Sequence, residues 1–218
     1  MPTYLRHHRV RLALHCLRPG DGPALLLLHG LGECAPREVA PELSSWPGSV
    51  HALDLTGHGA SSRPVGGGYS CELLLADADI ALSHLGTATL VGRGLGAYLA
   101  LQLAGLRPTL VRGAILCDGP GAAGGGANLT SAPAASTPLE SQHDADPRAL
   151  IELVADPRPP QYACVLARQA KRYSGLAQPL SVCGSERPEW LAAVVELLGL
   201  EPRGVSESLA EYARLACG

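Results

Sequence analysis

Hydrophobic and polar residues alternate near the start of the chain and then give way to short runs that are apolar throughout. From Val10 to Cys16, apolar side chains occupy every second position, which predicts a strand with one buried face. We expect it to pair with residues 3–7 as an antiparallel hairpin. Ala24–Leu28 is apolar without interruption, as in strands buried on both faces of a parallel sheet. The chain therefore passes from a half-exposed hairpin into a buried sheet.

Further short apolar runs follow, separated by segments with the length and periodicity of helices. Because strands that alternate with helices form right-handed βαβ units, this order predicts an α/β fold with a doubly wound, mostly parallel sheet. A chain of 218 residues accommodates one such domain, which we place over residues 1–218. We expect strands at 49–54, 87–92, 111–117 and 178–183, and helices at 36–45, 70–85, 95–106, 148–155, 158–172 and 188–199.

Composition and charge exclude several classes of function. The formal net charge is −3 with both signs mixed along the chain, which argues against nucleic acid and against a polybasic membrane anchor. No apolar run is long enough to span a bilayer, and the N-terminus is polar. The seven cysteines are widely spaced without a CxxC pair, which favours reduced thiols in a cytoplasmic protein and no metal site. We also expect no cofactor; the sequence leaves the oligomeric state open.

Three glycine-containing motifs follow successive predicted strands. They are His29-Gly30-Leu31-Gly32, the segment 54–61 with His58 between two glycines, and Gly92-Arg93-Gly94-Leu95-Gly96. The carboxyl ends of parallel strands meet at one edge of an α/β sheet, where ligands bind in such folds. For the first two motifs a structural interpretation competes with the functional one, because a glycine ends a strand well and a histidine often holds a turn.

The third motif has the glycine spacing of the nucleophile elbow, G-x-S-x-G, a strained turn between a strand and a helix. Gly92, Gly96 and Ala97 are small where strand and helix must pack closely. Gly94 stands where the elbow has its serine. Glycine at this place relieves the backbone strain and removes the nucleophile.

With these three motifs in this order, the chain resembles the α/β-hydrolase superfamily from about residue 3 to 118, and more loosely to 199. The resemblance implies an oxyanion hole made by the backbone N–H groups of Leu31 and Leu95, which do not depend on side-chain identity. His29, Gly30 and Arg93 complete the binding residues that we expect at this edge. The resemblance also implies that 119–172 is a reduced lid, in which the Gly/Ala/Pro-rich stretch 119–136 predicts a mobile loop.

The remainder of the catalytic triad departs from the family pattern, which places an acid and then a histidine after the nucleophile. After the strand at 178–183, Arg187 stands where the acid is expected and Glu186 is one place off. Asp118 offers an acid after the preceding strand, or an ordinary turn residue. No histidine follows His143, and the C-terminal part of the fold is truncated.

Two functions are compatible with these losses. The first is a non-catalytic pseudo-hydrolase that binds a small-molecule ligand or a protein partner. The alternative is a hydrolase or lyase for a small ester or carbonyl substrate, with a non-standard mechanism that uses the Leu31 and Leu95 amides and Asp118 or His58 as the base. Serine hydrolases stripped of their triad keep only about 10³- to 10⁴-fold acceleration over water, so the alternative needs such a recruited group.

Overall fold

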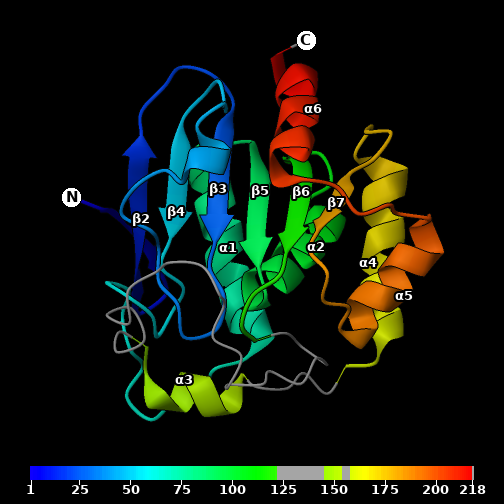
Figure 1. Ribbon diagram of the computed structural model, residues 1–218. Helices are drawn as coiled ribbons and strands as arrows, with labels where there is room; N and C mark the ends of the chain where they lie inside the picture. Colours follow the sequence, from blue (N-terminus) through cyan, green and yellow to red (C-terminus); the bar gives the residue numbers. More distant parts are fainter. Residues whose placement is uncertain (122–144, 154–157, 218) are drawn as a thin grey trace.

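The computed structural model of the protein describes residues 1–121, 145–153 and 158–217. These residues form one mixed sheet with helices on both faces (Figure 1). The segment 122–136 of the predicted mobile loop lies outside the described residues, as do residues 154 and 155 of a predicted helix.

The sheet has seven strands in the order β1-β2-β4-β3-β5-β6-β7. β1 pairs with β2 and β2 with β4 in antiparallel register, and the remaining neighbours are parallel. This confirms the α/β class, the doubly wound sheet and the N-terminal hairpin. The strands are β1 (Thr3–His7), β2 (Val10–Arg18), β3 (Ala24–Leu28), β4 (Val50–Leu53), β5 (Ala88–Arg93), β6 (Val111–Cys117) and β7 (Leu180–Cys183).

Helices cover the two faces of the sheet unequally. One face packs against α1 and α2, with α4 and α5 alongside α2, and the other face carries α6 (Figure 1). Each face therefore has its own apolar core, as expected for a sheet buried on both sides. The helices are α1 (Cys71–Leu85), α2 (Leu95–Leu106), α3 (Pro147–Glu152), α4 (Pro160–Tyr173), α5 (Glu189–Leu198) and α6 (Val205–Cys217).

The predicted helix at 36–45 is wrong. Only a single 3-10 turn, η1 (Pro41–Leu43), forms there. Pro41 falls in the middle of the expected helix, where it lacks the amide hydrogen and its ring opposes the preceding turn. Leu43, within the expected helix, and Trp46, which follows it, are nevertheless buried on the α6 face of the sheet.

The chain that follows β7 adds no further strand to the sheet within the described residues. After α5 the chain returns to the edge of β7 but makes only one bridge, between Val182 and Pro202. The N–H of Arg203 donates to the carbonyl of Val182 at 2.9 Å, and α6 begins at Val205. The connection thus passes into α6 within a few residues of the bridge.

Candidate functional site

The elbow between β5 and α2 has the close packing that its glycines predicted. Gly94 adopts φ 50° and ψ −113°, in the region that favours glycine. A Cβ on Gly92 would lie 2.6 Å from the Cα of Ala97, and one on Gly96 would lie 2.7 Å from the carbonyl oxygen of His29. Strand and helix approach so closely here that both flanking positions require glycine.

The two backbone amides predicted to form an oxyanion hole do converge on one point. The N–H of Leu31 donates to the carbonyl oxygen of Pro120 at 2.9 Å, and the N–H of Leu95 donates to the same oxygen at 3.2 Å. The N–H of Gly94 donates to the carbonyl of Cys117 at 3.1 Å. The acceptor between the two amides therefore belongs to the protein's own backbone.

Residues 118–121, which we call the covering segment, lie directly over the elbow. A Cβ on Gly94 would overlap the carbonyl oxygen of Pro120, and a Cβ on Gly30 would lie 2.7 Å from the Pro120 ring. Gly121 has φ 67°, and a Cβ there would overlap the side chain of Leu31. The segments meet this closely because Gly30, Gly94 and Gly121 have no side chains. Backbone of the covering segment therefore fills the space that a side chain at residue 94 would need.

His58 is buried against backbone groups. Its Nδ1 donates to the carbonyl of Thr56 at 3.1 Å, and its Nε2 accepts the N–H of Gly32 at 3.3 Å. Burial, reinforced by the nearby His29, lowers the pKa of His58 to about 4. At neutral pH the imidazole is uncharged and its lone pair already has a partner, which is the structural role that the sequence had left open.

His29 has the same kind of environment, with its ring centroid 4.9 Å from that of His58. Its Nδ1 donates to the carbonyl of Gly30 at 2.8 Å, and its Nε2 accepts the N–H of Leu55 at 3.1 Å. Burial lowers its pKa. The imidazole thus connects the loop after β3 to the loop after β4.

Asp118 joins the ends of β6 and β7. Its carboxylate accepts the N–H of Ser185 at 2.7 Å, the Ser185 hydroxyl at 3.2 Å and the N–H of Glu186 at 3.1 Å. Arg187, which stands where an acid was expected, donates to the carbonyls of Gly184 and Glu186 in its own loop. These groups stabilise the strand ends, and the structure does not bring Asp118 into a hydrogen bond with His58.

Arg93 forms an ion pair with Glu33, a residue that the sequence analysis did not single out. Arg93 Nη2 lies 3.0 Å from Glu33 Oε1, and Glu33 Oε2 accepts the N–H of Gly30 at 2.9 Å. Burial alone would raise the pKa of Glu33, but hydrogen bonding and charge from Arg93 bring it below its ordinary value. The pair ties the elbow to the loop after β3.

Asp54 is a second residue whose role could be found only from the structure. Its buried carboxylate accepts the N–H of Ala35 at 2.7 Å and that of Ala60 at 2.9 Å, and it lies 2.8 Å from Nε2 of His15. An acid at a strand end beside a glycine-rich loop was the only signal in the sequence. Asp54 organises the loops on which the candidate site is built.

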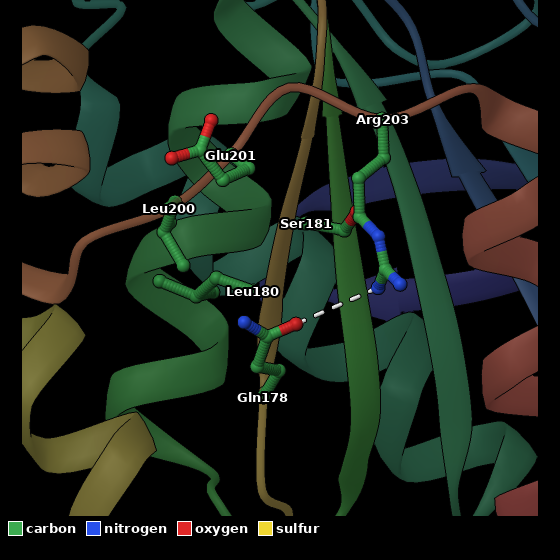
Figure 2. A pocket seen from close by; sticks show the side chains of 6 residues that line it. All are labelled: Gln178, Leu180, Ser181, Leu200, Glu201 and Arg203. Atoms are coloured by element: carbon green, nitrogen blue, oxygen red, sulfur yellow. Dashed lines mark hydrogen bonds between the residues drawn. The ribbon is translucent and has the colours of Figure 1, made fainter.

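Two surface cavities lie elsewhere, and neither includes a residue of the elbow or of the covering segment. One, of about 240 Å³, opens beside β7 (Figure 2). There Arg203 Nη1 donates to Gln178 Oε1 at 3.5 Å. The other, of about 270 Å³, lies between α1 and α2. Figure 2 shows the first cavity with its lining residues Gln178, Leu180, Ser181, Leu200, Glu201 and Arg203.

Within the described residues, His, Cys, Asp and Glu side chains form no group of three or more suited to hold a metal ion. The helices of this part of the chain are all too short or too polar to cross a membrane.

Comparison with known proteins assigns the family. Residues 25–217 match the alpha/beta hydrolase family, and the chain belongs to it. A 90-residue stretch is 38% identical to the magnesium-chelatase 30 kDa subunit of Rhodobacter capsulatus, covering 39% of this chain and 31% of that protein. A 120-residue stretch is 34% identical to bifunctional epoxide hydrolase 2 of Sus scrofa, covering 51% of this chain and 22% of that protein. The matches thus span less than a third of either relative.

Solved structures share the fold over nearly the whole chain. The thioesterase domain from the curacin biosynthetic pathway superposes with a TM-score of 0.68 at 20% identity, covering 100% of this chain and 99% of that one. A hypothetical protein of Pseudomonas aeruginosa PAO1 superposes with a TM-score of 0.66 at 19% identity, covering 99% and 98%. At this level of identity, the likeness shows the α/β-hydrolase fold.

The buried His58 predicts a loss of stability in acid. Its pKa is about 4 in the folded protein and about 6.5 when unfolded, so the unfolded chain binds the extra proton between these values. Its contribution is complete above pH 6.5 and decreases as the pH falls toward 4. Between pH 8 and pH 5 we expect it to remove about 2 kcal/mol from the free energy of unfolding, measured by urea denaturation.

The variant His58→Gln isolates this effect, because other ionisable groups also titrate in this range. In this variant, the difference between the free energies of unfolding at pH 8 and pH 5 should be smaller by about 2 kcal/mol. His8→Asn, at an exposed turn residue with φ 51° that asparagine tolerates, should leave the difference unchanged. An NMR titration that shows the His58 imidazole protonating near pH 6.5 would contradict the assignment.

The hydrogen bonds to Pro120 predict that the amide hydrogens of Leu31 and Leu95 exchange slowly with solvent in the ligand-free protein. Gly121→Ala should accelerate both exchanges, because its Cβ would overlap Leu31 and displace the covering segment. Gly199→Ala is the matched control: its φ is 62° but a Cβ there meets nothing within 4 Å. Hydrogen–deuterium exchange followed by NMR measures the exchange rates of both amide hydrogens in the unmodified protein and in the two variants. Fast exchange of both amides in the unmodified protein would rule out the covered site.

Proposed function

We propose that the protein is a non-catalytic member of the alpha/beta hydrolase family that works by binding a protein partner. One observation carries the proposal. The carbonyl oxygen of Pro120 accepts the N–H groups of Leu31 and Leu95, where a hydrolase of this fold would bind the charged oxygen of its transition state. A substrate oxygen has to displace this carbonyl before it can use the same amides.

The missing side chains support the same conclusion. Gly94 has no hydroxyl, and the chain passes from the bridge at Pro202 into α6 without a histidine. The alternative mechanism calls on His58 or Asp118 as the base. Each of these already makes hydrogen bonds to backbone N–H groups, which it would have to surrender to act on a substrate. No contact in the described residues favours that alternative.

Between the two kinds of binding, the covered elbow supports a protein partner over a small ligand. Backbone atoms of the covering segment occupy the position above Gly94, where small substrates are bound in the fold. The relative from Rhodobacter capsulatus is named as a subunit, which is a component of a larger assembly. A role in an assembly requires a folded scaffold and its surface, and this chain has both. Such a role does not require a nucleophile.

The proposal predicts no esterase activity, even when the serine is restored. We expect the unmodified protein and Gly94→Ser to hydrolyse p-nitrophenyl acetate no faster than an equal concentration of the heat-denatured chain. We also expect Gly94→Ser to lower the free energy of unfolding by about 2 kcal/mol or more, because left-handed strain adds to the overlap with Pro120. Ester turnover and urea denaturation are the measurements.

Gly199→Ser is the control for backbone strain, since its φ of 62° is left-handed and the space around it is open. This substitution should lower the free energy of unfolding by only about 1 kcal/mol.

Ester turnover by the unmodified protein that disappears in Asp118→Ala would overturn the non-catalytic assignment. Strong activity in Gly94→Ser would show that a base is present. If acetate or a small ester shifts the amide resonances of Leu31 and Leu95, the elbow binds small molecules and the partner assignment fails.

A further inference from the structure

Two cysteines end neighbouring strands on the face of the sheet that α6 covers. Cys117 is the last residue of β6 and Cys183 the last of β7, and the two are register partners in the parallel ladder. Neighbouring strands lie about 4.8 Å apart, within the range of roughly 4.4–6.8 Å between the Cα atoms of disulfide-bonded cysteines. Both residues are half-buried and pack against the α6-side core. Their placement therefore suits a reversible bond between the sulfurs.

Hydroxyl groups surround the sulfur of Cys183. The Ser208 hydroxyl of α6 lies 3.3 Å from Cys183 Sγ, and the Ser181 hydroxyl lies 3.9 Å from it. The two hydroxyls are themselves 2.6 Å apart. The Ser208 hydroxyl donates its single hydrogen to the carbonyl oxygen of Gly204 at 3.0 Å, so the hydroxyl hydrogen left for the Cys183 sulfur is that of Ser181. A polar hydrogen near a sulfur stabilises its anionic form, which favours a thiolate at Cys183.

The pKa values of the two thiols are shifted in opposite directions. The hydrogen bond with Cys117 lowers the pKa of Cys183, and Ser208, Ser181 and the charge of Arg203 lower it further against the effect of burial. The same hydrogen bond and burial raise the pKa of Cys117. The charged and titratable groups that act on the pair are Arg93, Asp118, Arg203 and Tyr212.

The cavity beside β7 is lined by residues that act on Cys183, although neither cysteine lines it. Ser181, which contacts Cys183, and Arg203, whose charge acts on Cys183, both line that cavity (Figure 2). Cys117 and Cys183 are themselves half-buried, so part of each residue is accessible to solvent in the folded protein.

We propose that Cys183 and Cys117 form a thiol–disulfide redox pair, in which Cys183 reacts with a small hydroperoxide and Cys117 resolves the product. This site is separate from the covered elbow, and the proposal does not rest on the non-catalytic assignment. Cys183 is the attacking sulfur because the Ser181 hydroxyl lies near it and the positive charge of Arg203 acts on it. Cys117 is the resolving sulfur because it is held beside Cys183 as a protonated thiol.

The chemistry balances in two steps. The Cys183 thiolate attacks one peroxide oxygen, so that an S–O bond forms, the O–O bond breaks and the leaving alkoxide or hydroxide takes a proton. Cys117 then attacks the sulfur of the resulting sulfenic acid. An S–S bond forms and the S–O bond breaks, and the departing hydroxide leaves as water with the thiol proton of Cys117. The two sulfurs supply the two electrons that reduce the peroxide.

The test uses the full-length, fully reduced protein treated with one equivalent of hydrogen peroxide. Peptide mapping by mass spectrometry should find a Cys117–Cys183 disulfide that dithiothreitol reverses. In Cys117→Ser, a sulfenic acid should accumulate at Cys183 and be trapped by dimedone. In Cys183→Ser, Cys117 should remain reduced at the same dose.

Cys164→Ser is the matched control, because Cys164 is also half-buried and free, and it should oxidise as the unmodified protein does. With iodoacetamide, Cys183 should be alkylated several-fold faster than Cys164 at pH 7 and at pH 6, because its environment favours the thiolate. Absence of the disulfide in the unmodified protein would overturn the proposal. Alkylation of Cys183 no faster than Cys164 at both pH values would also overturn it.

Discussion

Two backbone N–H groups at the edge of the sheet require an acceptor, and the structure supplies one from its own chain. In a working hydrolase of this fold, the corresponding amides face solvent or substrate until the reaction places charge between them. Here the carbonyl oxygen of Pro120 lies between these amides and accepts a hydrogen bond from each. The glycines at residues 30, 94 and 121 follow from this contact, because a side chain at any of them would displace the covering segment. Glycine at residue 94 and the close approach of the covering segment thus depend on one another.

The polar residues around the elbow are committed to holding loops together. His29 and His58 each use both ring nitrogens on backbone groups, and the Asp54 carboxylate accepts two amide hydrogens from separate loops. Asp118 performs a similar role between the ends of β6 and β7. Such buried polar networks are rigid because every member would leave an unsatisfied group behind if it moved. The loops at this edge of the sheet are therefore held in one arrangement by hydrogen bonds to their own backbone.

The sequence predicted those features that depend on residue type. The strand at 111–117 and the helix at 95–106 have the predicted bounds, because long apolar patterns determine both. The amides of Leu31 and Leu95 were predicted from the resemblance to the α/β-hydrolase superfamily, which the glycine motifs carry. The contact with Pro120 could not be predicted, since a backbone carbonyl has no residue signature and its partners lie far away in the sequence. The helix at 36–45 failed for a local reason, the proline at residue 41.

The single bridge between Val182 and Pro202 has a consequence for behaviour at high protein concentration. An exposed sheet edge is a template on which other molecules can add strands and begin to aggregate. At the β7 edge, the returning chain occupies the carbonyl of Val182, and proline has no amide hydrogen to offer a further strand. At the opposite edge, β1 carries the charged side chain of Arg6. The truncated sheet thus ends in residues that discourage fibril-like growth from either side.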